Sequence, residues 1–258
     1  MTDALHAEWI KLRTLAGTWW LLLGAVAVTV AASAGIAAST HISPGGADSQ
    51  DPTKLALIGI DLGQAVVAVL AVLAVTEEYG TGMIRLTLAA IPRRPMMLGA
   101  KAINLAGLTL ITGVPAVAGC LIAGRLLLPA AGLAPAHGYA LISIAHGPTL
   151  RAAFGSVLYL GLIALLSLGI GVVVRDTAVS TGIALALLYL PPLLAQLISG
   201  PWRRHIQQIA PMPAGLAIQA TRTIRSLPIA PWAGLAVLAT WAAGMLLVGL
   251  VVLKARDA

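Results

Sequence analysis

Six long runs of apolar residues, nearly free of charge, constrain the fold of this chain more than any other feature. They cover residues 19–39, 56–76, 102–124, 152–174, 177–199 and 231–253. Each run approaches the ~20 residues that a helix needs to cross about 30 Å of hydrocarbon. Backbone groups in hydrocarbon must be hydrogen-bonded within their own segment, so each run is expected to be helical. The sequence therefore predicts an all-α, polytopic membrane protein with six transmembrane helices, forming one domain over residues 1–258.

The composition agrees with the bilayer as the main solvent. The chain is 59% hydrophobic and only 10% charged, whereas soluble domains carry about 25% charged residues. Its net charge of +7 would suggest nucleic acid in a soluble protein. Here the basic residues lie mostly between apolar runs, where they set topology and meet anionic headgroups. We therefore expect the lipid bilayer, and no nucleic acid, as a partner.

Charges around the first run predict the orientation. Lys11 and Arg13 precede it, and Asp48 and Asp51 follow it. If the N-terminus is inside, cytoplasmic segments hold nine basic residues and external segments hold seven. Because Lys and Arg are enriched on the cytoplasmic side, we expect a multi-pass plasma-membrane protein with both termini in the cytoplasm.

Residues 3–16 have the pattern of an amphipathic helix. Apolar side chains recur at i, i+4, i+7 and i+11, which places them on one helical face; they are Leu5, Trp9, Leu12 and Ala16. Glu8 and Lys11 lie elsewhere on the helix. The pattern favours a helix on the inner membrane interface, followed by Trp19 and Trp20 at headgroup level. The alternative is a frayed N-terminal tail.

Asp61 is the one acid within an apolar run. It lies at i,i+3 from Gln64, so both share a face that should point into the bundle. The functional interpretation is a cation- or proton-linked site, or a polar lining of a substrate path. The structural interpretation is that Asp61, near the outer end, reaches interfacial water. Gly59 and Gly63 form a G-x-x-x-G pattern that predicts close helix packing.

Prolines interrupt two apolar stretches. Pro191 and Pro192 lie within the fifth run and remove two backbone donors, so a kink is expected. This kink is either a hinge for alternating access or a fixed bend. Residues 126–150 are uncharged but contain several prolines and glycines, which favours a loop or re-entrant segment over a seventh span.

No motif for catalysis or metal binding is present in the sequence. The pattern G-x-x-x-x-G-K-[ST] of phosphate-binding loops does not occur, nor do H-E-x-x-H and C-x-x-C. The five histidines are scattered. We therefore expect no enzymatic activity, no metal and no cofactor in this chain.

The most informative segment is 76–101, with the sequence TEEYGTGMIRLTLAAIPRRPMMLGAK. Two acids and a tyrosine close the second run, and a glycine-bounded turn follows. Residues 83–90 then predict a short, mostly apolar helix that ends at Pro92. A short apolar helix at the cytoplasmic face would expose apolar surface to water, so we expect either a partner protein or lipid to bury it.

This segment resembles the permease family of type-2 ABC exporters, in which many members read E-Y-x-x-G-x-I-R-x-T-L followed by P-R-R. The matching residues are Glu78, Tyr79, Gly82, Ile84, Arg85, Thr87, Leu88, Pro92, Arg93 and Arg94. Weaker similarity covers Glu8–Trp9, Lys11–Arg13, Trp19–Trp20, Gly63–Gln64, Arg175–Ala178 and Pro211–Ala217. Pro213 departs from the family pattern, where a small polar residue is frequent.

The resemblance implies six spans, an N-terminal elbow helix and a cytoplasmic coupling helix in the loop after the second span. It implies a second permease copy or paralogue, and separate ATPase subunits that bind ATP and Mg. The residues implied to dock on the ATPase are Met83, Ile84, Leu86 and Leu88. Those implied to pair with its acids or with headgroups are Arg85, Arg93 and Arg94. Glu78 and Tyr79 would tie the loop to the elbow helix, which carries Glu8, Trp9, Lys11 and Arg13, while Gly80 and Gly82 would allow the turn.

The function implied is ATP-driven export by alternating access, powered by the separate ATPase subunit. A possible substrate path includes Asp61, Gln64, Pro191 and Pro192. Two alternatives remain open. One is a proton- or ion-coupled secondary transporter that uses Asp61, and the other is a membrane-embedded enzyme or a non-transporting assembly subunit.

Overall fold

A computed structural model of the chain describes residues 2–14, 16–40, 50–83, 94–133, 142–222 and 224–256. The secondary structure of this part of the chain consists of helices joined by turns and irregular segments, and no strand occurs in it. The helices are α1 (Thr2–Thr14), α2 (Ala16–Ser39), α3 (Pro52–Ala56), α4 (Ile60–Gly80), α6 (Arg94–Leu127), α7 (Gly147–Val174), α8 (Thr177–Leu197), α9 (Pro201–Ile209), α10 (Pro211–Leu216) and α11 (Pro231–Arg256), with 3-10 turns η3 (Ala217–Gln219) and η4 (Ile224–Ser226).

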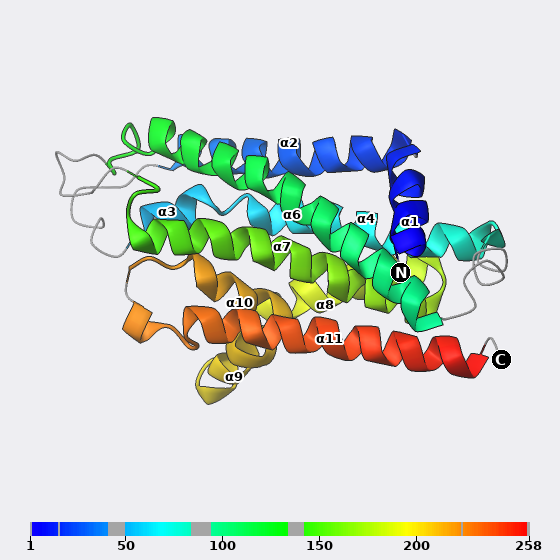
Figure 1. Cartoon of the computed structure of the whole chain (residues 1–258). Helices are drawn as coiled ribbons and strands as arrows, with labels where there is room; N and C mark the ends of the chain where they lie inside the picture. The colour runs from blue at the N-terminus through cyan, green and yellow to red at the C-terminus, as the bar shows by residue number, and fades with distance from the viewer. Residues whose placement is uncertain are drawn as a thin grey trace.

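Six of these helices, α2, α4, α6, α7, α8 and α11, are long and apolar enough to cross a membrane. They run side by side along the bundle, and the N- and C-termini lie at the same end (Figure 1). We call this end the terminal end. Helix α1 lies at the terminal end and makes a steep angle with α2, whereas α3, α9 and α10 lie towards the opposite end (Figure 1). The predicted all-α fold is confirmed for the described residues, as is the prediction of six helices long and apolar enough to span a membrane.

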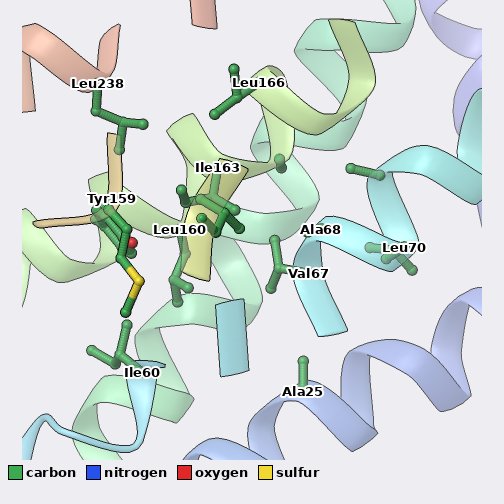
Figure 2. Close-up of a cluster of buried hydrophobic side chains, with 14 of the residues drawn as sticks. Ala25, Ile60, Val67, Ala68, Leu70, Tyr159, Leu160, Ile163, Leu166 and Leu238 are labelled. Carbon is green, nitrogen blue, oxygen red and sulfur yellow. The ribbon is translucent and has the colours of Figure 1, made fainter. Parts of the chain in front are cut away.

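Helix α7 is the centre of the bundle. It packs against α4, α6, α8 and α11, and its apolar window is the most buried of the six. Figure 2 shows Tyr159, Leu160 and Ile163 of α7 meeting Val67 of α4 and Leu238 of α11. Because lipid tails are as apolar as leucine, this core depends on close packing rather than on exclusion of water.

The contact between α2 and α4 is especially close. A Cβ added to Gly59 would clash with the carbonyl oxygen of Thr29, and one added to Gly63 would clash with the Thr29 hydroxyl. The Gly59 amide also donates to Ser33 Oγ over 3.0 Å. The predicted close-packing role of the G-x-x-x-G pattern is therefore confirmed, and its partner is α2.

Several spans differ by a few residues from their predicted limits, and the second and third are examples. The second was expected at 56–76, but α3 ends at Ala56, a turn follows, and α4 runs from Ile60 to Gly80. The third was expected at 102–124, but α6 runs from Arg94 to Leu127. Both helices include charged residues at the terminal end, where Glu78 of α4 pairs with Lys101 of α6.

The segment 200–230 also differs from expectation. Because prolines flank residues 214–226 in the sequence, we expect a short amphipathic helix there on the outer surface, and this expectation is wrong. Ala214 and Gly215 are buried in α10, and the 3-10 turns η3 and η4 follow. Pro213 fits because it lies in the first turn of α10, where amides lack helical partners. The exposed amphipathic helix of this region is α9, none of whose residues is buried.

The two prolines of the fifth span do not end its helix, because α8 continues through Pro191 and Pro192. Between α6 and α7 the described residues, 128–133 and 142–146, form turns and extended chain, and residues 134–141 lie outside the described part.

Candidate functional site

Lys101 is the centre of a buried ion network at the terminal end. Its Nζ lies 2.9 Å from Glu8 Oε2 of α1 and 2.6 Å from Glu78 Oε1 of α4. It also donates to the carbonyl oxygen of Ala74 over 3.0 Å. Lys11 of α1 approaches the same Glu78 oxygen at 2.5 Å. The charges of two carboxylates and two ammonium groups therefore balance one another. This matters because Lys101 is buried, with only 2% of its surface exposed.

This network orients α1. Its charged side faces the bundle, because Glu8 is buried, while Trp9 is 37% exposed. Asn104 of α6 adds a hydrogen bond from Nδ2 to the carbonyl oxygen of Leu5 over 2.8 Å. Helix α1 is thus fixed to the ends of α4 and α6 through polar contacts, with apolar side chains turned outward.

The Glu78–Lys101 pair closes the base of the connection between α4 and α6. The two residues are 23 positions apart in sequence. Lys101 lies two turns into α6, and Glu78 lies in the last turn of α4. The two helices that flank this connection are therefore joined by a charge-assisted hydrogen bond.

Arg94 joins this base to the last helix. Its Nη1 donates to the carbonyl oxygens of Leu253 and Lys254, at 2.7 and 3.1 Å. These carbonyls belong to the last turns of α11, where helical acceptors lack partners and a positive charge is favourable.

The turn between α7 and α8 contacts the same end of α4. Arg175, in the left-handed conformation with φ 66°, links the two helices, and Asp176 caps α8 by accepting from the Val179 amide over 2.8 Å. The Arg175 guanidinium lies 5.0 Å from the centre of the Tyr79 ring, a cation–π distance. Only Arg175 and Asp176 separate α7 from α8, so the connection is a tight hairpin.

The expected coupling helix falls largely outside the described residues. Ile84, Arg85, Leu86, Leu88 and Arg93 are among those not described. Gly82 has φ +72°, so the turn after α4 needs a glycine there, whereas Gly80 is the last residue of α4. Met83 follows with 43% of its surface exposed.

The opposite end of α4 borders a cavity of about 520 Å³. Its lining includes the charged residues Asp51, Lys54, Asp61 and Arg222, together with apolar side chains of α3, α10 and the 227–229 turn. We call it the outer cavity. Of the predicted substrate-path residues it contains Asp61 and Pro192, while Gln64 is fully buried beside it and Pro191 is half-buried in α8.

Asp51 holds the wall of this cavity together. Its Oδ1 caps α3 by accepting from the Thr53 and Lys54 amides, and also accepts from Thr221 Oγ1 over 2.7 Å. Its Oδ2 accepts from the amides of Thr221 and Arg222. Both carboxylate oxygens are therefore occupied in joining the loop before α3 to the segment before α11.

Asp61 is part of a polar cluster that reaches into the core. Gln64 Nε2 donates to the Asp61 carbonyl oxygen over 3.1 Å, and Tyr159 donates to Gln64 Oε1. Tyr189 of α8 donates to the Asp61 carbonyl oxygen. The bonds from Gln64 and Tyr189 use the Asp61 backbone carbonyl, while Asp61 itself lines the cavity.

Only part of both sites could be predicted from the sequence. Glu78, Lys11 and Glu8 were predicted, but Lys101 was given no role, although a lysine beside a long apolar run is a signal for a buried partner. Asp61 and Gln64 were predicted, but the tyrosines near them were not. Gln219, a buried side chain of the outer cavity, had no sequence signal.

Metal binding has no support in the described part of the chain, where no group of three or more His, Cys, Asp or Glu side chains is placed to hold an ion. Comparison with models of known protein families and with curated proteins found no match.

Proposed function

We propose that this chain is the membrane-spanning permease subunit of an ATP-driven exporter that acts with a separate ATPase subunit. The observation that carries this proposal is the Glu78–Lys101 ion pair at the base of residues 79–100. That segment contains the motif that resembles the ATPase-coupling loop of type-2 ABC exporters. Six spanning helices, with both termini at the end where this loop emerges, agree with such a subunit.

The ion network gives the loop a mechanical function. A force on a loop with free ends would be absorbed by local bending. Here the base is tied to α1 by Glu8 and Lys11, and to α11 by Arg94. Displacement of the loop would therefore move four helices together.

ATP would drive this displacement by binding differently to two states of the ATPase dimer. ATP and Mg would be held by the ATPase, and the permease would alternate between inward- and outward-facing forms. A second permease copy or paralogue would complete the transporter. The apolar windows of α8 and α11 are only 22% buried in the single chain, which leaves surface for that copy and for lipid.

Under this proposal the terminal end faces the cytoplasm of a cell whose plasma membrane the chain spans. The exposed Trp19 and Trp20 begin α2 at this end, which agrees with headgroup level. The outer cavity would then face the outside.

Co-purification with a candidate ATPase tests the proposal. The chain is co-expressed with an ATPase that carries a phosphate-binding loop, and the double variant Ile84→Asp, Leu88→Asp is compared with wild type. We expect both proteins to insert in the membrane, and only wild type to retain the ATPase and its ATP turnover. The matched control is Trp202→Asp, Ile209→Asp, which adds two acids to exposed positions of α9 at the other end. The proposal fails if wild type never retains the ATPase, or if both double variants behave alike.

A second candidate is a proton- or ion-coupled transporter, favoured by the position of Asp61 at the outer cavity. In that case Asp61→Asn would abolish transport while Ile84→Asp, Leu88→Asp would leave it intact. The exporter proposal expects the reverse for the loop variant.

A further inference from the structure

We propose that the outer cavity binds a zwitterionic amphiphile, with Asp61 receiving its cationic group and Lys54 its anionic group. The identification of this ligand as the exported substrate rests on the proposed function, whereas the binding site itself does not. The cavity volume of about 520 Å³ lies within the range of about 300–1,000 Å³ that is usual for small-molecule sites.

The charges of the cavity remain separated. The Asp51 carboxylate is occupied by Thr53, Lys54 and Thr221 groups of the cavity wall. In the described part of the chain, the Asp61 and Lys54 side chains are not joined to each other by a hydrogen bond or an ion pair, although both line the cavity. A negative and a positive group thus face one cavity without neutralising each other in a salt bridge.

Gln219 adds an independent sign of a ligand. This residue lines the cavity and is 2% exposed, yet its Nε2 has no hydrogen-bond partner among the residues that the structure describes. Buried amide donors are almost always paired, because an unpaired one costs roughly 1–3 kcal/mol. A ligand oxygen, such as one of a phosphate, would satisfy it.

The remaining lining is apolar and fits a hydrocarbon chain. It comes from α3, α10, η3 and the turn before α11, and includes Leu55, Ile58, Met212, Leu216, Leu227 and Ile229. A ligand that matches the whole cavity carries both charges on one headgroup and an alkyl or acyl tail. Bilayer lipids and free amphiphiles share this chemistry.

Three water-soluble probes with one tail test the charge requirement. They are hexylphosphocholine with both charges, hexyltrimethylammonium with the cation alone, and hexyl phosphate with the anion alone. Each is titrated calorimetrically into the purified chain in phosphatidylglycerol nanodiscs, without an ATPase. We expect hexylphosphocholine to bind at least about tenfold more tightly than either other probe, because only it forms both charge-assisted contacts.

Three variants assign the contacts. Asp61→Asn should weaken hexylphosphocholine to the level of hexyl phosphate, and Lys54→Gln should weaken it to the level of hexyltrimethylammonium. Gln219→Leu should weaken the two phosphate probes and leave the cation unchanged. Glu77→Gln is the matched control: it removes a carboxylate from the other end of α4 and should change nothing.

Equal binding of the three probes by wild type would overturn the proposal even if a variant failed to fold. It would also be overturned if Asp61→Asn and Lys54→Gln kept the preference for hexylphosphocholine. Repetition in phosphatidylcholine nanodiscs separates the two sources of the ligand, because loss of probe binding there identifies a bilayer lipid as the occupant, and retention identifies a free amphiphile. If the chain binds hexylphosphocholine but never retains an ATPase, the proposed binding site stands and the proposed exporter function is rejected.

Discussion

Lys101 and Glu78 form a buried ion pair of 2.6 Å that joins α6 to the last turn of α4. Glu8 of α1 contacts the same lysine at 2.9 Å. One lysine therefore connects three helices, α1, α4 and α6, near the connection between α4 and α6.

Loss of Lys101 should destabilise the terminal end strongly. Lys101→Met leaves Glu8 and Glu78 as buried carboxylates without their shared partner, and removal of one partner of a buried pair costs roughly 3–5 kcal/mol. The triple variant Glu8→Gln, Glu78→Gln, Lys101→Met removes the charges together and should recover most of the loss. Thermal unfolding in nanodiscs measures both. Equal melting temperatures of the single and triple variants would show that the network does not act through charge.

Arg94 should hold the end of α11. Arg94→Met removes a charged donor from two carbonyl oxygens, which is expected to cost roughly 1.5–3 kcal/mol locally. Hydrogen exchange of residues 250–256 should accelerate, while exchange in the middle of α11 remains slow. Lys254→Met is the control, since it removes a nearby positive charge without touching the bonds to the carbonyls. Similar exchange in the two variants would argue against the contact.

Close packing of α2 on α4 predicts a selective rescue. Gly63→Ala should cost about 1–3 kcal/mol by overpacking against the Thr29 hydroxyl. Thr29→Ala should relieve this cost because it removes the clashing group. Gly59→Ala clashes instead with the Thr29 backbone, so the same second change should not relieve it. Gly35→Ala, which meets no neighbouring atom, should be nearly neutral. The melting temperatures of these variants measure each effect. If Thr29→Ala rescued both glycine variants, the different contacts assigned to Gly59 and Gly63 would be contradicted.

Asp51 should stabilise the wall of the outer cavity. Asp51→Ala removes the cap of α3 and the acceptor for the Thr221 and Arg222 amides, so residues 219–222 should exchange hydrogen faster. Asp51→Asn keeps one carbonyl acceptor and should lie between wild type and Asp51→Ala. Unchanged exchange in Asp51→Ala would mean that other contacts hold this wall.

The spans could be predicted from the sequence because the length of an apolar run is a local property that the bilayer thickness dictates. Their ends at the loop could not. Glu78 and Lys101 look like the limits of their runs, but the structure keeps both within helices because they neutralise each other. Glu8 contacts Lys101 from 93 positions away, and no local pattern reveals such a partner.

In the candidate sites, too, only the residues with a local sequence signal could be predicted. Asp61 stood out because an acid within an apolar run is costly and therefore informative. Gln219 did not, because its burial depends on α10 folding inward rather than forming the expected surface helix over 214–226. The pairing of Asp51 with residues 221–222 likewise arises only in the folded chain.

A photo-crosslinking amino acid at position 83 tests the central claim most directly. Met83 is exposed at the start of the loop, and Trp202, exposed on α9, provides the control position at the other end. After irradiation of cells that express each variant, adducts are identified by mass spectrometry. The account predicts an adduct with an ATPase that carries a phosphate-binding loop at position 83 and none at 202. The absence of such an adduct at 83, or equal adducts at both positions, would contradict it.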